Sequence, residues 1–567
     1  MKTPILNCTI SLLVAASSAF SQIYLSGPVS GILEDTTYIV EDDITVLAGT
    51  ELIIEPGAVF YFSPECDFNI HGLLSAAGAE ADSIIFLRRN PDQPWGHIVF
   101  YDDCHDSSAM TYCLISGGYA SPYNSWPYNC GGGILCIYSS PAFEHCKISE
   151  NHAGYCGGGL AFYLDSYAVL NECLVNGNQA DNDGGGIQCF NSSPTIINSI
   201  IEANTAVVVG GGISCGESAP IIRTCLFQSN NSGFSGGGFF CDRSFNIIIN
   251  NCQFLQNHSD GPGGGITIGQ ESSIIKVDSC DIIGNSAAQG GGIFCDISTV
   301  EITRCLLYAD SASGNGGSFA CNYGTISFNQ CTICKNFAAD SAGAAYVTDY
   351  SYVHWHNSIV DNNYGQCGVF VDNTSDLAVD YCDVFANENG NFSGNIPHEL
   401  GFIVNINANG DSCDTFYNIF LDPLYFDPLN GDFHLTENSP CIDAGDPTSP
   451  LDPDSTIADI GVYYFDQSTV VEDPTIILHP STFILSAYPN PFNSITAITF
   501  VLNQDAEIKL AVYNVLGQEV AEFGKCNAES GKNTVVWDAS GQASGMYFVR
   551  LLVDGGQSVV RKVVLLK

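Results

Sequence analysis

The chain has 567 residues, and 61 aspartates and glutamates against 16 lysines and arginines give a formal net charge of −45 at pH 7. Such a charge repels nucleic acids and anionic lipid surfaces, so the composition excludes a nucleic-acid-binding protein. The length exceeds one ordinary compact core, which favours several domains or an elongated repeat array.

The first residues, MKTPILNCTISLLVAASSAFSQ, predict a secretory signal peptide over residues 1–21. One lysine precedes an apolar run that ends in small residues, with Ala19 and Ser21 at the positions that a signal peptidase reads. The run is too short to cross a bilayer, and no second apolar stretch of about 18 residues follows it. We therefore expect an exported chain with no transmembrane helix.

Glycine triplets recur along the chain at intervals of 26 or 27 residues. They begin at Gly131, Gly157, Gly184, Gly210, Gly236, Gly263 and Gly290, with degenerate forms at Gly316 and Gly343. Most triplets follow a second pattern, in which Cys or Ser is followed two residues later by an apolar residue and five residues later by Asn. A further apolar column lies three residues before each Cys or Ser, at Phe143, Leu170, Ile196, Ile222, Ile249, Val277, Ile302 and Phe328.

Each repeat consists of short apolar or alternating segments separated by Asn and Gly, and none is long enough for an amphipathic helix. A period near 26 is too short for a propeller blade, and the leucine pattern of a leucine-rich repeat is absent. The repeat therefore predicts a parallel β-helix with about three strands per coil.

The asparagines are predicted to form a structural ladder, because stacking places equivalent residues of successive coils next to one another. Its members are Asn151, Asn178, Asn204, Asn230, Asn257 and Asn285. An asparagine side chain can bond both the backbone and its copies above and below, which suits a turn column.

Cysteine occupies two columns, which alternate with apolar positions on the same face. We interpret them as small buried hydrophobic residues of the core rather than as a disulfide framework or metal ligands. Cys130 and Cys156 each precede a glycine triplet at a turn, and they are the pair that we expect to form a disulfide if any pair does.

Catalytic carboxylates on the outside of the helix are candidates at Asp102 and Asp103, and at Asp380 and Asp383. A pair of such groups could hydrolyse a glycosidic bond, but clusters of this kind are expected without function in so acidic a chain. The basic residues fall in different repeat columns, which argues against a lyase that stabilises negative charge.

No cofactor and no metal are predicted. Asp452, Asp454 and Asp459 in LDPDSTIAD offer oxygens to calcium, but their spacing is not that of an EF-hand and a turn explains them equally well. His354 and His356 lie on one face of a strand, yet no carboxylate or cysteine nearby completes a metal site. We interpret them as part of an exposed strand.

GTELIIEPGAVFYF (49–62), HGLLSAAGAEADSIIF (71–86) and WGHIVF (95–100) resemble the first coils of right-handed parallel β-helix proteins of the pectin-lyase-like superfamily. DPLYFDPLNGDFHLTENSPCIDAGDP (422–447) resembles the closing segment of such helices. The resemblance implies a right-handed β-helix over residues 22–467, with an N-terminal cap and a closing segment. The superfamily contains lyases and hydrolases, but none of its catalytic motifs is present here, and fold alone does not imply an enzyme.

After a linker expected over 468–482, residues 483–567 resemble the type A C-terminal sorting domain of the type IX secretion system. The resemblance rests on LSAYPNPFNSITAITFVL (485–502), IKLAVYNVLGQEV (508–520), VVWDASGQASGMYFVRL (535–551) and the terminal VVRKVVLLK. It implies contact with the secretion machinery and a place at the cell surface or outside the cell. Alternating strands separated by turns independently predict a small Ig-like β-sandwich.

The sequence therefore predicts an all-β, exported protein whose elongated helix binds a polysaccharide or another surface, in the manner of an adhesin. The alternative is a carbohydrate-active hydrolase that uses outward carboxylates, with a lyase as a further variant. The sequence favours binding over catalysis.

Overall fold

The computed structural model describes residues 22–467, 484–488, 494–502, 506–514, 518–528, 531–542, 545–553 and 557–565. The chain forms two compact units, residues 1–467 and 468–567. The predicted signal peptide and the predicted linker lie outside the described residues. Within the described ranges every regular element is a strand, and no helix there could cross a membrane.

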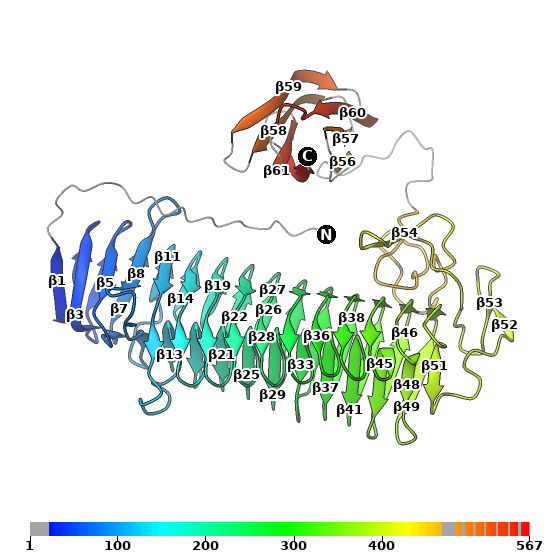
Figure 1. Cartoon of the computed structure of the whole chain (residues 1–567), viewed down its shortest axis with the longest axis horizontal. Coiled ribbons are helices and arrows are strands. Elements are labelled where there is room, and N and C mark those ends of the chain that lie inside the picture. Colours follow the sequence, from blue (N-terminus) through cyan, green and yellow to red (C-terminus); the bar gives the residue numbers. More distant parts are fainter. Residues whose placement is uncertain are drawn as a thin grey trace. The chain divides into compact units, whose positions relative to one another are not determined.

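One coil of the first unit contains three strands of three or four residues and a fourth of two residues. A representative coil runs through β25 (Ile213–Gly216), β26 (Ile221–Arg223), β27 (Leu226–Gln228) and β28 (Asn231–Ser232). Each strand pairs in parallel with its equivalent in the next coil, as Cys215 does with Cys241. The predicted parallel β-helix is thus confirmed, with a short fourth strand added to the three that were expected (Figure 1).

Stacked coils build continuous sheets along the helix axis. The two outer strand columns, which contain β25 and β27, merge into one 28-stranded sheet from β1 (Ile23–Pro28) to β51 (Phe392–Gly394), because β3 (Thr37–Val46) pairs in both columns. The middle column is a 14-stranded sheet. Its strands are β2 (Gly31–Leu33), β4 (Glu51–Ile54), β7 (Leu73–Ala77), β10 (Ala109–Thr111), β14 (Ala142–Glu144), β18 (Val169–Asn171), β22 (Thr195–Ile197), β26, β30 (Ile248–Asn250), β34 (Ile275–Asp278), β38 (Thr299–Thr303), β42 (Thr325–Asn329), β46 (Tyr352–His356) and β49 (Asp376–Asp380).

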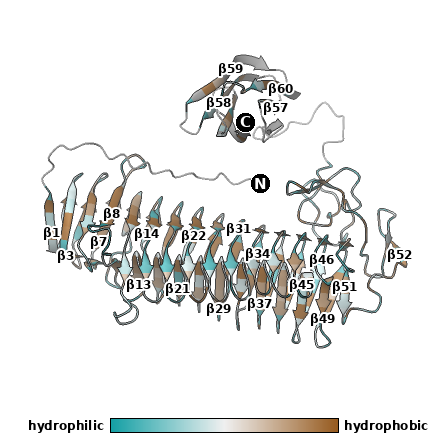
Figure 2. Cartoon of the chain, in the orientation of Figure 1, coloured by the Kyte–Doolittle hydropathy of each residue, from teal (hydrophilic) through white to brown (hydrophobic). Residues whose placement is uncertain are grey.

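The core fills the inside of the coils with columns of like residues. All eight members of the predicted apolar column from Phe143 to Phe328 are buried. Phe227 and Phe254 stack in neighbouring coils with ring centroids 4.5 Å apart. Figure 2 shows hydrophobic residues recurring along the strands of successive coils. Burial of apolar area contributes about 25 cal/mol per Å², so this continuous column supplies the main driving force for stacking.

The cysteine columns line the same core, and all 23 cysteines of residues 22–467 are buried and free. The interpretation of both columns as core residues is confirmed. Ser199 replaces Cys in one coil because the position also accepts a hydrogen bond, from the Cys173 N–H at 3.1 Å. In a neighbouring coil the Cys225 N–H donates to the Cys252 sulfur at 3.5 Å.

The asparagine ladder forms as predicted, and all six of its members are buried. The Asn230 Oδ1 atom accepts hydrogen bonds from the backbone N–H of Asn204 at 3.1 Å and from its side chain at 3.0 Å. The Asn230 side chain in turn donates to the Ile201 carbonyl at 2.8 Å and to Asn257 at 3.0 Å. Each rung therefore satisfies buried polar groups of both neighbouring coils.

Asp310 replaces asparagine in one rung, and an ionised carboxylate cannot donate the hydrogen bond that the asparagine amide donates. Its Oδ1 accepts from the Asn285 backbone at 2.7 Å, but its buried Oδ2 has no hydrogen-bond partner. In the next coil the side chain of Asn336 donates to the Leu307 carbonyl at 3.1 Å, which an ionised aspartate cannot imitate. Complete burial raises the pKa of Asp310 well above its usual value.

We expect Asp310→Asn to stabilise the helix at pH 7 by about 1–2 kcal/mol, because it adds a donor and removes a buried carboxyl group. A carboxyl whose pKa is raised in the folded state loses stability as pH rises above its unfolded value of about 4. The gain should therefore vanish below pH 4, which urea unfolding at pH 3.5 and pH 7 would check. The reverse change Asn257→Asp is the matched control, and it should destabilise the helix at pH 7 but much less at pH 3.5. Equal gains in stability for Asp310→Asn at both pH values would contradict the argument.

A closing segment that includes residues 419–462 covers one face of the last coils. Its buried residues Ile419, Leu435 and Ile460 pack against Ile359 of the helix. The Lys335 ammonium donates to the Pro428 carbonyl at 2.6 Å. This cover shields outward apolar residues of several coils, among them Leu306 and Cys334, from solvent.

The second unit consists of two antiparallel sheets. The sheets are β56 (Ile484–Tyr488), β57 (Ile495–Leu502) and β60 (Gly531–Asp538), and β58 (Ala506–Asn514), β59 (Glu519–Ala528), β61 (Gly545–Val553) and β62 (Gln557–Leu565). Their inward residues, among them Phe500, Leu510 and Trp537, form one apolar cluster. The predicted small β domain is confirmed.

Candidate functional site

A hollow on the nine-stranded sheet of short strands is a candidate binding site of the first unit. This nine-stranded sheet contains β12 (Tyr119–Ala120), β16 (His152–Ala153), β20 (Gln179–Ala180), β24 (Thr205–Ala206), β28, β32 (His258–Ser259), β36 (Ser286–Ala287), β40 (Ser311–Ala312) and β44 (Phe337–Ala338). A pocket of about 400 Å³ crosses β32, β36, β40 and β44. We call it the trough, and it is lined by His258, Ser259, Asp260, Ser286, Ala287, Ala288, Ser311, Ala312, Ser313 and Phe337.

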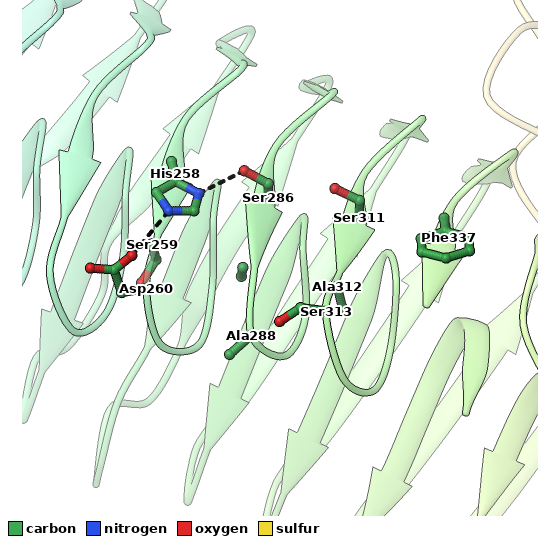
Figure 3. A pocket seen from close by; sticks show the side chains of 10 residues that line it. His258, Ser259, Asp260, Ser286, Ala288, Ser311, Ala312, Ser313 and Phe337 are labelled. Atoms are coloured by element: carbon green, nitrogen blue, oxygen red, sulfur yellow. Dashed lines mark hydrogen bonds and ion pairs between the residues drawn. The ribbon is translucent and has the colours of Figure 1, made fainter. Parts of the chain in front are cut away.

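The trough exists because side-chain size changes along one stacked column. His258 pairs with Ser286, Ser286 with Ser311, and Ser311 with Phe337 in successive coils. The two serines are short and the residues at each end are bulky, so the outward surface is hollow between them (Figure 3). The size of the residue that directly follows each ladder position therefore determines the shape of the trough.

The two ends of the trough offer different chemistry. At one end the His258 imidazole is fixed between Ser286 Oγ at 2.8 Å and Asp260 Oδ1 at 3.2 Å (Figure 3). At the other end the Phe337 ring is 49% exposed and offers an apolar surface. The floor contributes hydroxyl groups and methyl groups, and the lining holds no lysine or arginine. This combination suits a neutral ligand that presents both hydroxyl groups and C–H faces.

A second cluster, the His–Asp cluster, brings His354, His356 and Asp380 together on the outer face of the 14-stranded sheet. The Asp380 Oδ1 atom lies 3.1 Å from His354 Nε2 and 2.7 Å from His356 Nδ1. Partial burial acts to raise the pKa of Asp380, but the hydrogen bonds from both histidines hold it well below its usual range. The expectation that no carboxylate lies near the histidines is wrong, because Asp380 pairs with His356 across neighbouring strands.

Asp380 and Asp383 do not face a common cleft. Asp380 belongs to β49 and contacts the two histidines, whereas Asp383 begins β50 (Asp383–Phe385) in the 28-stranded sheet. The closing segment buries Asp383, whose carboxylate accepts from the Leu421 N–H at 3.1 Å and from the Cys441 thiol at 3.4 Å. Burial raises the pKa of Asp383 well above its usual value.

Asp102 and Asp103 lie in an exposed turn after β9 (Ile98–Phe100). Asp103 Oδ1 lies 2.7 Å from His71 Nδ1, and the His71 ring stacks on Tyr101 with centroids 4.1 Å apart. This contact anchors the turn to the preceding coil. A catalytic role for either aspartate stays a prediction.

The aspartates proposed as calcium ligands hold turns of the closing segment. Burial raises the pKa of Asp459 to about 7, and its oxygens accept from the backbone of Asp443 at 2.7 Å and of Phe465 at 2.6 Å. Asp452 accepts from the Asp459 N–H at 2.8 Å, and Asp454 accepts from the Thr456 hydroxyl at 2.7 Å. Their backbone contacts agree with the turn interpretation, and calcium binding stays a prediction.

Cys130 and Cys156 lie in neighbouring coils, where both thiols are buried and free. The Gly131 N–H bonds to the Cys156 carbonyl at 2.9 Å, and the Tyr163 hydroxyl donates to the Cys130 sulfur at 3.3 Å. The structure brings the pair together without joining it, so the disulfide stays a prediction.

Comparison with known proteins identifies two families along the chain. Residues 94–235 match the family described as "Right handed beta helix region", and residues 486–566 match the "Secretion system C-terminal sorting domain". The two matches fall in different compact units. No curated protein matches the chain.

Solved structures resemble this chain only weakly. PfbA, a surface adhesin of Streptococcus pneumoniae, is 9% identical over 68% of this chain and 91% of its own, with a TM-score of 0.26. The enzymatically active domain of tailspike protein 2 of bacteriophage CBA120 is 12% identical over 94% of this chain and 72% of its own, with a TM-score of 0.19. Likeness at this level carries no argument about function.

Proposed function

Because the chain joins a right-handed β-helix region to a C-terminal sorting domain that exports it to the cell surface or the medium, we propose that it binds a neutral polysaccharide there. The observation that carries the proposal is the trough between His258 and Phe337. Binding sites for a ligand with apolar and polar faces usually combine an aromatic side chain with hydroxyl groups in a hollow of the surface.

The dimensions of the trough favour a chain-like ligand. Successive coils lie about 4.8 Å apart, so the four rungs from β32 to β44 extend over roughly 14 Å. His258, Ser286, Ser311 and Phe337 follow one another in a row over successive coils (Figure 3). A linear glycan can lie along the coils, with one ring on Phe337 and hydroxyl groups beside Ser311 and Ser286.

Electrostatics favours a neutral glycan over an acidic one. The protein carries a formal net charge of −45, and Asp260 at the rim of the trough is 74% exposed as a side chain. His258, which could carry positive charge, already contacts Asp260. A polyanion would therefore be repelled both at long range and at the site.

Binding of the full-length chain to a panel of neutral and acidic polysaccharides would test the proposal. We expect retention on a neutral polysaccharide. Phe337→Ala should weaken binding about tenfold, because a stacked aromatic ring contributes about 1.4 kcal/mol. Ser311→Trp should abolish binding, because the indole would fill the hollow.

Thr205→Trp is the matched control for the blocking variant, because Thr205 lies in the same column outside the trough. It should leave binding unchanged. Equal affinities of the wild type, Phe337→Ala and Ser311→Trp would show that the trough is not the binding site. Release of new reducing ends from the bound glycan would favour the hydrolase alternative. Asp380 and Asp383, the carboxylates considered for that activity, do not face a common cleft.

A further inference from the structure

We propose that the His–Asp cluster binds a divalent transition-metal ion such as zinc through His354, His356 and Asp380. This site lies on the 14-stranded sheet, whereas the trough lies on the nine-stranded sheet, so the inference goes beyond the polysaccharide site. The three side chains come from β46 and β49, which are paired rigid strands.

The donor atoms have the spacing that a single ion needs. The donor atoms of His354, His356 and Asp380 all lie within 4.8 Å of one another. An ion bound at about 2.0–2.2 Å from each ligand requires ligand atoms that are close together on one side of it. Imidazole nitrogens with one carboxylate oxygen form a ligand set that suits zinc, iron or copper rather than magnesium or calcium.

The closing segment provides the outer contacts that metal-binding histidines need. His356 Nδ1 faces Asp380, and its other ring nitrogen, Nε2, lies 3.1 Å from Ser449 Oγ and 3.6 Å from Asp446 Oδ2. Histidine ligands commonly donate their second N–H to a carboxylate, which fixes the ring and raises its basicity. Asp446 is itself held, because its backbone N–H donates to the Asn357 side chain at 2.8 Å.

The cluster differs from the other contacts between histidine and acid in the described residues. The pairs are His71–Asp103, His97–Asp67, His152–Asp181, His145–Glu172, His258–Asp260 and His434–Asp432, and each brings one imidazole to one carboxylate. Only at Asp380 do two imidazoles converge on one oxygen in the described part of the chain. A simple ion pair does not need the second ring, whereas a metal site does.

Solvent can reach the cluster, so an ion can enter and leave. The side chains of His354 and Asp380 are 34% and 37% exposed, and that of His356 is 20% exposed. Three protein ligands leave a tetrahedral ion one position for water or for an exogenous ligand.

Titration of the full-length, chelator-treated protein with Co²⁺ and then Zn²⁺ would test the site. We expect one equivalent of Co²⁺ to give visible d–d absorption without a thiolate charge-transfer band in the near ultraviolet, and Zn²⁺ to displace it. His354→Gln and Asp380→Asn should each weaken binding at least tenfold. Asp446→Asn should weaken it about tenfold and shift the cobalt spectrum, since outer partners tune affinity by about 10–100-fold.

His152→Gln is the matched control, because His152 forms a comparable contact with Asp181 at 2.8 Å without a second histidine. It should bind Co²⁺ like the wild type. Circular dichroism would confirm that each variant is folded. Failure to bind one equivalent, a thiolate band from the buried cysteines, or unchanged affinity in folded His354→Gln and Asp380→Asn would each overturn the proposal.

Discussion

Replacing Gly237 with alanine should divide the β-helix into two separately unfolding parts. A Cβ atom at this position would lie 2.4 Å from the carbonyl oxygens of both Gly264 and His258 in the next coil. Both contacts are with backbone atoms, so a side-chain rotation cannot relieve them. The coils would have to separate, at a cost of about 3 kcal/mol, the upper end of what overpacking usually costs.

The consequence extends beyond one residue because coupling in a repeat array passes only between neighbours. The Gly237 N–H bonds to the Gly263 carbonyl at 3.0 Å, and the Gly212 N–H bonds to the Gly237 carbonyl at 3.0 Å. Movement of Gly237 weakens the contacts with both neighbouring coils. The coils on either side then lose the cooperativity that joined them.

Calorimetry and urea unfolding followed by circular dichroism would measure the effect. We expect the transition of the first unit to split, with the less stable part unfolding at lower urea concentration. Gly177→Ala is the control, because Gly177 also lies in a turn but a Cβ atom added there would meet nothing within 4 Å. Because φ at Gly177 is 65°, we expect this substitution to lower the free energy of unfolding by only about 1 kcal/mol. Equal effects of the two substitutions would show that close approach of the coils is not the cause.

The triplet explains why the repeat could be predicted from sequence. At Gly236 the backbone has a φ of 68°, whereas at Gly237 the limit is the approach of the next coil. Each glycine has a local reason that recurs every coil, and so do the ladder asparagines and the buried cysteines. Periodic constraints leave a periodic sequence, which is why the sequence predicts the β-helix correctly, whereas the sorting domain is recognised from the resemblance of its separate segments.

The candidate sites are harder to predict from the sequence, because each depends on residues of different coils. Asp380 follows His356 by 24 residues, and Ser449 follows it by 93, so a search near the histidines could not find either. The trough depends on the residue after each ladder position, and reading His258, Ser286, Ser311 and Phe337 as one column would have revealed it. The sequence pattern predicts which side chains point outward more readily than it predicts which side chains of other coils lie beside them.

Replacing Asn230 with leucine should destabilise the β-helix by about 4 kcal/mol, because the change leaves two buried groups unpaired at about 1–3 kcal/mol each and disturbs the ladder. The two donors that lose their acceptor are the backbone N–H of Asn204 and one N–H of its side-chain amide. Leucine is close to asparagine in size, so the loss would come from hydrogen bonds rather than from a cavity.

Urea unfolding of Asn230→Leu against Asn231→Leu would separate the ladder from general effects of the substitution. Asn231 is the next residue, and it is exposed on the outer surface of β28, so its replacement should change stability by less than about 0.5 kcal/mol. Comparable losses in both variants would contradict the ladder argument. Because Asn230 bonds forward to Asn257 and backward to Asn204, its removal weakens two interfaces at once. The ladder thus stabilises the stack by joining each coil to both neighbours, which the hydrophobic core alone cannot do with the same directional specificity.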